Sequence, residues 1–208
     1  MDQLGFALYL ITDRSTATRP PADIVEECLD AGLRAVQLRE KDLPVRDMLA
    51  LARELRETTR RHGARLVVND RADVALVAGA DGVQRTHTSL PVADLRAMAP
   101  AGFLIGASTH SPAEARQAVA EGADFVVFGP VYDTPSKRAF GPPQGLGALE
   151  AVARAVSRPV IAVGGITPEC AGEVLAAGAA GVAVIRGIYG APRPADATKA
   201  FLDALGRA

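Results

Sequence analysis

"AEGADFVVF" (residues 120–128) contains the pattern that decides the fold of this chain. A glycine ends a helix-like stretch, and a short apolar run with the length of a β-strand follows it. The same order recurs in "DAGLRAVQL" (30–38), "VAGADGVQ" (77–84) and "AAGAAGVAVI" (176–185). Glycine at such a position is typical of a helix that ends in the left-handed conformation. Each repeat therefore predicts a helix that stops at the glycine and a buried strand after it.

Working outward from these repeats predicts eight strands, each followed by a helical segment. Amphipathic stretches such as residues 45–63, which carry leucine at helical spacing, lie between the strands. Strands that alternate with helices pair in parallel, and near-continuous apolar strands indicate a sheet covered by helices. The predicted strands centre on residues 7–11, 35–38, 66–68, 82–84, 104–107, 125–128, 160–163 and 181–185.

Eight such units in 208 residues predict an α/β protein with a single (β/α)8 barrel domain that spans residues 1–208. The alternative is an open, doubly wound sheet. That fold would favour a Gly-x-Gly-x-x-Gly turn after an early strand, and the sequence has no such turn. The spacing therefore favours the barrel.

Composition excludes several classes of partner. The chain has 23 basic and 24 acidic residues, so its net charge of −1 gives no reason to expect nucleic acid or an anionic membrane surface. The first residues lack a basic region before their short apolar run, and we interpret that run as a strand instead of a signal peptide. No apolar stretch is long enough to span a bilayer. We therefore expect a cytoplasmic protein.

The active site of such a barrel lies at the carboxyl ends of the strands, so the residues there carry the functional prediction. The second strand leads into "QLREK", in which alternation places Gln37, Arg39 and Lys41 on one face and Leu38 and Glu40 on the other. Two cations and an amide that point together indicate a clamp for an anion or a heterocycle. A structural rim of salt bridges is the alternative.

Polar residues also end the third and fifth strands. Asn69 and Asp70 follow the third strand directly, although Asp70 could instead cap the next helix. Ser108 and His110 follow the fifth strand. Ser111, which precedes a proline, has a sufficient role as a helix start, whereas Ser108 and His110 have no such structural reason to be there.

The longest loop, "GPVYDTPSKRAFGPPQG" (129–145), follows the sixth strand. It places Thr134, Ser136 and Lys137 among glycines and prolines. Hydroxyl groups, a lysine and an exposed backbone together suit phosphate oxygens. Long loops in compact barrels are often lids or binding loops, and a disordered insertion is the alternative here.

The seventh and eighth strands end in residues that predict a phosphate cradle. Gly164 and Gly165 follow the seventh strand, and Ile185 and Arg186 follow the eighth. Backbone N–H groups at these positions commonly hold a phosphate in this fold. The site would then have two anion-binding regions with Asp70 between them. A carboxylate in such surroundings predicts Mg²⁺ that bridges to a diphosphate.

Seven segments resemble the thiamine phosphate synthase/TenI family: "YLITD", "QLREK", "VVNDRADVALVAGADGV", "IGASTH", "FGPVYDTPSK", "AVGGIT" and "GVAVI". They cover about residues 8–187 in the family's order. The resemblance implies a (β/α)8 barrel. It also implies the joining of 4-amino-5-hydroxymethyl-2-methylpyrimidine diphosphate to 4-methyl-5-(2-hydroxyethyl)thiazole phosphate, with release of diphosphate and with Mg²⁺.

The resemblance implies roles for individual residues. Lys41, Ser108 and Lys137 would assist departure of the diphosphate, and Asp70 would be a Mg²⁺ ligand. The substrates would be bound by Gln37, Arg39, Lys41, Asn69, Ser108, Thr134, Ser136, Lys137, Gly165, Ile185 and Arg186. Small phosphorylated molecules are thus the expected partners, with no nucleic acid or membrane, and a homodimer is possible.

Three positions depart from the family pattern. Gln84 replaces a histidine of the synthases, and Ser89 stands where synthases have a second metal-binding aspartate. Arg186 replaces a serine and could either strengthen a phosphate grip or crowd it. The departures at Gln84 and Ser89 resemble the TenI branch, a thiazole tautomerase in which His110 would shuttle a proton. A tautomerase and a non-catalytic thiazole-phosphate binder are therefore the alternative functions.

Overall fold

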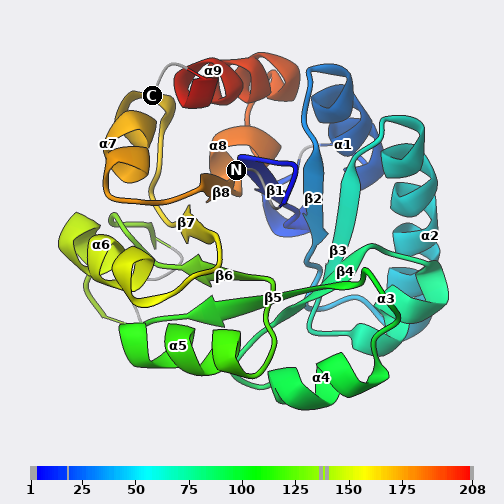
Figure 1. Cartoon of the computed structure of the whole chain (residues 1–208). Helices are drawn as coiled ribbons and strands as arrows, with labels where there is room; N and C mark the ends of the chain where they lie inside the picture. The colour runs from blue at the N-terminus through cyan, green and yellow to red at the C-terminus, as the bar shows by residue number, and fades with distance from the viewer. Residues whose placement is uncertain (1–3, 18, 136–137, 139–140, 207–208) are drawn as a thin grey trace.

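The computed structural model describes residues 4–17, 19–135, 138 and 141–206. Within them, eight parallel strands form a closed barrel in the order β1 to β8, and β1 pairs with β8. Helices surround the barrel (Figure 1). The strands are β1 (Leu8–Ile11), β2 (Ala35–Leu38), β3 (Arg65–Asn69), β4 (Gly82–Arg85), β5 (Leu104–Thr109), β6 (Phe125–Phe128), β7 (Val160–Val163) and β8 (Gly181–Val184).

Helices follow the strands, as the sequence predicts. They are α1 (Pro21–Asp30), α2 (Val45–Arg61), α3 (Ala72–Ala78), α4 (Val92–Met98), α5 (Pro112–Ala120), α6 (Gly145–Ala155), α7 (Ala171–Ala176), α8 (Arg186–Tyr189) and α9 (Pro194–Gly206), with short 3₁₀ helices at Arg14–Thr16 and Pro168–Cys170. The predicted glycine stops Gly32, Gly79, Gly122 and Gly178 all have positive φ. Within the described residues, no helix has both the length and the apolar character needed to cross a bilayer.

The strands separate two apolar layers, which explains why they are nearly continuous in apolar residues. Tyr9, Phe125 and Ile161 belong to the layer inside the barrel, where the rings of Tyr9 and Phe125 meet edge to face with centroids 6.0 Å apart. Leu8 and Leu10 belong to the layer between barrel and helices. Because alternate residues of a strand face opposite sides, both sets must be apolar.

Two aspartates in the glycine-containing repeats join neighbouring strands at the amino end of the barrel. Asp81, before β4, accepts a hydrogen bond of 2.8 Å from the backbone N–H of Leu66 at the start of β3. Asp124, before β6, accepts one of 2.8 Å from the N–H of Ile105 in β5, and it also pairs with Arg96. These carboxylates satisfy backbone donors that would otherwise lack a partner.

We predict that Asp124→Ala lowers the free energy of unfolding by about 1–3 kcal/mol, because the Ile105 N–H loses its acceptor. Urea denaturation followed by circular dichroism would measure the change. Arg154→Ala is the control, since its side chain is 78% exposed and it pairs with Glu150 only at the surface. That variant should change the unfolding free energy by less than about 0.5 kcal/mol. Equal midpoints for the two variants would contradict the role of Asp124.

Candidate functional site

A cavity of about 980 Å³ opens at the carboxyl ends of the strands. Side chains that follow every strand from β1 to β8 contribute to its wall, from Asp13 after β1 to Arg186 after β8. Its volume lies at the upper end of the range usual for small-molecule sites. The cavity can therefore accommodate two small substrates side by side.

Most of the residues predicted from the sequence meet in this cavity. Ser136 and Lys137 lie outside the described residues. The predicted residues that line the cavity are Gln37, Arg39, Lys41, Asn69, Asp70, Ser108, His110, Thr134, Gly165, Ile185 and Arg186.

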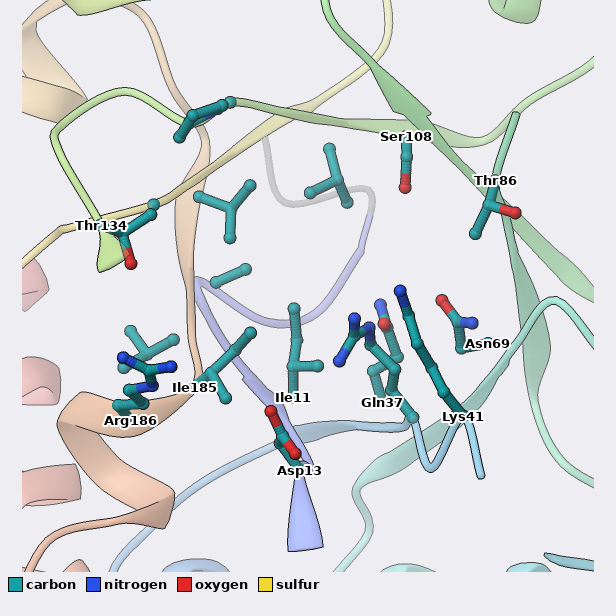
Figure 2. Close-up of a pocket in the computed structure, with 18 of the residues that line it drawn as sticks. Ile11, Asp13, Gln37, Lys41, Asn69, Thr86, Ser108, Thr134, Ile185 and Arg186 are labelled. Atoms are coloured by element: carbon teal, nitrogen blue, oxygen red, sulfur yellow. The ribbon is translucent and has the colours of Figure 1, made fainter. Parts of the chain in front are cut away.

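Figure 2 shows two groups of polar side chains on opposite sides of the cavity. Gln37, Lys41 and Asn69 lie together on one side, whereas Thr134 and Arg186 lie on the other side. Each group therefore brings at least one cation and one neutral polar side chain to the cavity wall. This separation suits two anionic groups held apart from each other.

Three cations of the cavity wall, Arg39, Lys41 and Arg186, form no ion pair with a carboxylate of the described residues. None of the ion pairs found anywhere in the described residues includes one of these three side chains. Arg71, which also lines the cavity, does pair with Asp73. Cations without an internal partner in a concave site attract anionic ligands from solution.

The prediction that Glu40 faces away from Gln37, Arg39 and Lys41 is wrong. β2 ends at Leu38, so strand alternation does not continue through the rest of the motif. Glu40 lines the same cavity and is only 2% exposed. Its Oε2 accepts a hydrogen bond of 2.9 Å from the backbone N–H of Arg14, and burial raises the pKa of its carboxyl group. Glu40 thus joins the loop after β1 to the loop after β2.

Asp70 does not cap the helix that follows it, so that alternative is wrong. Arg71 occupies the cap position of α3, and no side chain caps the helix there. Asp70 instead has a φ of 66°, an uncommon conformation for a residue other than glycine. Its Oδ1 accepts a hydrogen bond from the hydroxyl of Ser89, whose Oγ in turn accepts from the backbone N–H of Thr86.

The residues after β5 have defined partners. Ser111 caps α5 as predicted, because its side chain accepts from the N–H of Glu114. The ring Nδ1 of His110 lies 2.7 Å from the carbonyl oxygen of Gly129. A carbonyl oxygen can only accept, so Nδ1 carries the proton, and Nε2 of the neutral ring is left as an acceptor.

Gly165 allows the loop after β6 to approach the loop after β7. A Cβ atom at Gly165 would lie 2.5 Å from the carbonyl oxygen of Asp133, and the residue has a φ of 66°. Next to it, the N–H of Tyr132 donates to the carbonyl oxygen of Gly164 at 3.0 Å. The glycines therefore hold the segment that leads to Thr134 against the cavity rim.

Sequence reasoning missed several residues of the wall. Asp13 follows β1. It is a polar residue at a strand end, but no function was assigned to it from the sequence. Thr86, His87 and Thr88 follow β4 in the same way, so their position at a strand end was the signal that could have identified them. The additional polar lining residues are Asp13, Glu40, Arg71, Thr86, His87, Thr88 and Gln144.

Comparisons with known proteins agree with this geometry. A relative from Geobacter sulfurreducens is 50% identical over 99% of this chain and 97% of its own length. A protein of Methanoculleus marisnigri that is named thiamine-phosphate synthase is 44% identical over 99% of this chain and 98% of its own. Among solved structures, thiamine phosphate pyrophosphorylase from Pyrococcus furiosus matches with a TM-score of 0.89 and 37% identity, covering 97% of this chain and 96% of that one.

The sequence profile of a family described as thiamine monophosphate synthase matches residues 8–188, which include all eight strands. The match runs from the first strand to the residues that complete the cavity after β8. This chain therefore belongs to the thiamine monophosphate synthase family.

Proposed function

We propose that this protein joins 4-amino-5-hydroxymethyl-2-methylpyrimidine diphosphate to 4-methyl-5-(2-hydroxyethyl)thiazole phosphate and releases diphosphate. The observation that carries the proposal is one cavity with polar and cationic side chains on two opposite sides. Such an arrangement suits two phosphorylated substrates whose reacting ends meet in the middle. The relatives named thiamine-phosphate synthase support the same transferase reaction.

The side of the cavity formed after β2, β3 and β5 is the proposed pyrimidine diphosphate site. Arg39 and Lys41 would neutralise the diphosphate, and Asn69 and Ser108 would donate hydrogen bonds to its oxygens. Gln37 is already oriented, because its Nε2 donates to the hydroxyl of Tyr9 at 3.1 Å. Its carbonyl oxygen is thereby left for the donor groups of a heterocycle.

The side formed after β6, β7 and β8 is the proposed thiazole phosphate site. Thr134 and Arg186 would bind the phosphate together with the backbone at Gly165 and Ile185. A guanidinium group can donate two parallel hydrogen bonds to a phosphate, so Arg186 would strengthen this grip. Ser136, which lies outside the described residues, is proposed to contribute to this site from the same loop, whereas Lys137, also outside them, is proposed to contact the diphosphate.

The mechanism follows from where negative charge develops. When the bond to the diphosphate breaks, the leaving group gains charge and the pyrimidine methylene becomes cationic. Groups already aimed at the diphosphate stabilise this state without reorganising, and such electrostatic preorganisation is often the largest catalytic contribution. We assign this role to Lys41 and Ser108, and we propose that Lys137, which lies outside the described residues, assists them. The thiazole nitrogen then adds to the cation, a step that needs no general base.

The carboxylate of Asp70 suits a magnesium ion that is also bound by the phosphate oxygens of the substrate. Within the described residues, no cluster of three histidine, cysteine or acidic side chains could hold a metal by itself. Mg²⁺, however, is commonly bound by one or two carboxylates together with phosphate oxygens and water. Asp70 would hold such an ion against the diphosphate, and the ion would neutralise charge on the leaving group.

The cellular location, the partners and the assembly of the protein are predictions. We propose that it acts in the cytoplasm on small phosphorylated molecules and that it does not act on nucleic acid or membranes. A homodimer is a possible assembly. The near-neutral composition, with 23 basic and 24 acidic residues, supports the absence of polyanionic partners.

A thiazole tautomerase is the second candidate function, and one observation favours it. The contact between His110 and Gly129 fixes an imidazole whose Nε2 can accept a proton. An imidazole held in this way could move a proton during aromatisation of a carboxythiazole phosphate. The synthase reaction makes no comparable use of His110.

We predict that the purified chain forms thiamine phosphate from both substrates with Mg²⁺, and that Asp70→Asn lowers kcat/KM by about 100-fold. The amide keeps the size of the carboxylate but cannot balance a divalent cation. Chromatography of the product would measure turnover, and Mn²⁺ binding in the presence of inorganic diphosphate would measure the metal directly. The variant should show slower turnover and weaker Mn²⁺ binding.

Asp73→Asn is the matched control for that experiment. Asp73 lies three residues further along, is 61% exposed at its side chain and does not line the cavity. Its substitution should leave kcat/KM within about twofold, as expected for a surface ion pair. If Asp70→Asn and Asp73→Asn had the same small effect, Asp70 would not be the metal ligand.

A further prediction separates the two functions. His110→Asn can still donate to the Gly129 carbonyl but lacks the basic Nε2, so we expect synthase activity to stay within about threefold. Isomerisation of carboxythiazole phosphate, assayed in parallel, would instead fall by about 10²–10⁴-fold if His110 moved the proton. A chain that isomerises the thiazole but never forms thiamine phosphate would be the tautomerase. One that binds thiazole phosphate yet performs neither reaction would be a non-catalytic binder.

A further inference from the structure

A glutamine side chain lies buried beneath the diphosphate side of the cavity. Gln84, on β4, is only 1% exposed and is not part of the cavity wall. Its Nε2 donates a hydrogen bond of 3.0 Å to Oγ of Ser108 on β5. Among the described residues, its Oε1 has no hydrogen-bond partner. Within the described residues, this amide therefore forms one side-chain hydrogen bond, and its partner Ser108 is a residue of the cavity wall.

The barrel makes room for this amide at a specific position. Gln84 lies opposite Gly106 in the pairing of β4 with β5. A Cβ atom at Gly106 would lie 2.3 Å from Oε1 of Gln84 and 2.4 Å from a ring carbon of Phe125. The backbone is fixed as well, because the carbonyl oxygen of Gln84 accepts from the N–H of Asp70 at 2.9 Å. The strand register and the space at Gly106 thus allow the amide to lie beside Ser108.

The direction of this hydrogen bond determines where the proton of Ser108 can go. A serine hydroxyl has one proton and two lone pairs, whereas an amide nitrogen only donates. Once Gln84 donates to Oγ, the hydroxyl cannot give its own proton back to that nitrogen. Ser108 points into the cavity in Figure 2, so its proton is available to a ligand there.

A merely structural residue at this depth would have little reason to be an amide. A buried carbonyl oxygen without a partner costs free energy, and an apolar side chain of similar size would avoid that cost. Buried polar groups that are only partly satisfied are often found where function requires them. The polar contact with Ser108 is the one feature of Gln84 that an apolar residue could not supply.

We propose that Gln84 is a positioning residue that makes the Ser108 hydroxyl a hydrogen-bond donor toward the diphosphate. This inference rests on the function proposed above, which places a diphosphate on that side of the cavity. Gln84 acts only through Ser108, because its own side chain does not reach the cavity. The amide thus sets the polarity of a hydroxyl that would otherwise rotate between donating and accepting.

Two variants of Gln84 test the proposal. Q84E has the same shape but presents an ionised acceptor that would draw the Ser108 proton away from the ligand. Q84M has a similar length but can neither donate nor ionise. Isothermal titration with inorganic diphosphate in MgCl₂ would measure the dissociation constant between pH 5.5 and 8.5, with kcat/KM for thiamine phosphate formation measured alongside. Circular dichroism would confirm that each variant is folded.

We expect Q84E to bind diphosphate about tenfold more weakly than the unmodified chain at pH 8.5, and Q84M to bind it several-fold more weakly. Burial raises the pKa of a carboxyl group, so the introduced carboxyl should become protonated within the tested range. It can then donate to Ser108 again, and the defect should shrink as the pH falls. Asp70, which follows β3, and His110, which follows β5, are the same in both proteins.

The Ser108→Ala background separates positioning from simple charge repulsion. If Gln84 acts through Ser108, then adding Q84E to S108A should cause little further loss, because the hydroxyl is already absent. An equal loss in both backgrounds would overturn the proposal, as would Q84E or Q84M binding diphosphate as tightly as the unmodified chain at every pH. If the unmodified chain bound no diphosphate and formed no product, the proposed function would fail together with this inference. If the unmodified chain formed thiamine phosphate but Q84E and Q84M bound diphosphate as tightly as it does, the inference about Gln84 would fail and the proposed function would stand.

Discussion

Closure of the barrel through the pairing of β1 with β8 is the constraint on which the rest of the structure depends. Eight parallel strands that close on each other must place all their carboxyl ends at one rim, whatever their separation in the sequence. Gln37 and Arg186 share one cavity for this reason, although 148 positions separate them. The amino ends of the strands serve stability instead, because Asp81 and Asp124 connect neighbouring strands there. Stability and chemistry are thus assigned to opposite ends of the same strands.

The cavity gathers charges that the described residues do not balance. Arg39 and Lys41 both line the cavity and form no ion pair within the described residues. The acidic wall residues accept hydrogen bonds from elsewhere: Asp13 from Ser15, Glu40 from the Arg14 backbone and Asp70 from Ser89. Gathering like charges in a concave site opposes folding, and an anionic ligand relieves that repulsion. We therefore expect the empty cavity to be electrostatically unfavourable and to become favourable when diphosphate and phosphate enter. The surrounding barrel, with its two apolar layers, supplies the stability that tolerates this arrangement.

Periodicity was sufficient to predict the barrel because the strands are short and apolar and four of them follow a predicted glycine stop, as β6 follows Gly122. Several wall residues could be predicted because they lie at the end of a strand, as Asn69 does in β3. Prediction failed where the backbone leaves the strand: Glu40 lies past the end of β2, so alternation no longer determines its direction. It also failed for contacts between strands. No local pattern indicates that Gln84 donates to Ser108, because the register of β4 against β5 and the space above Gly106 decide that contact.

The departures from the family pattern around β4 have a common physical effect. Gln84 donates to Ser108 on one neighbouring strand, and Ser89 donates to Asp70 beside the other. Both are neutral, so these two side chains add hydrogen bonds to the wall residues Ser108 and Asp70 but no negative charge. A second carboxylate here would compete with the substrate for a divalent ion, whereas a hydroxyl leaves more of the ion's coordination to phosphate oxygens. Metal binding should then depend more strongly on the diphosphate, and Arg39 and Lys41 should carry a larger share of its neutralisation. If the proposed metal binds at Asp70, the residues of β4 and the loop after it would set the balance between metal and protein cations while the reaction stays the same.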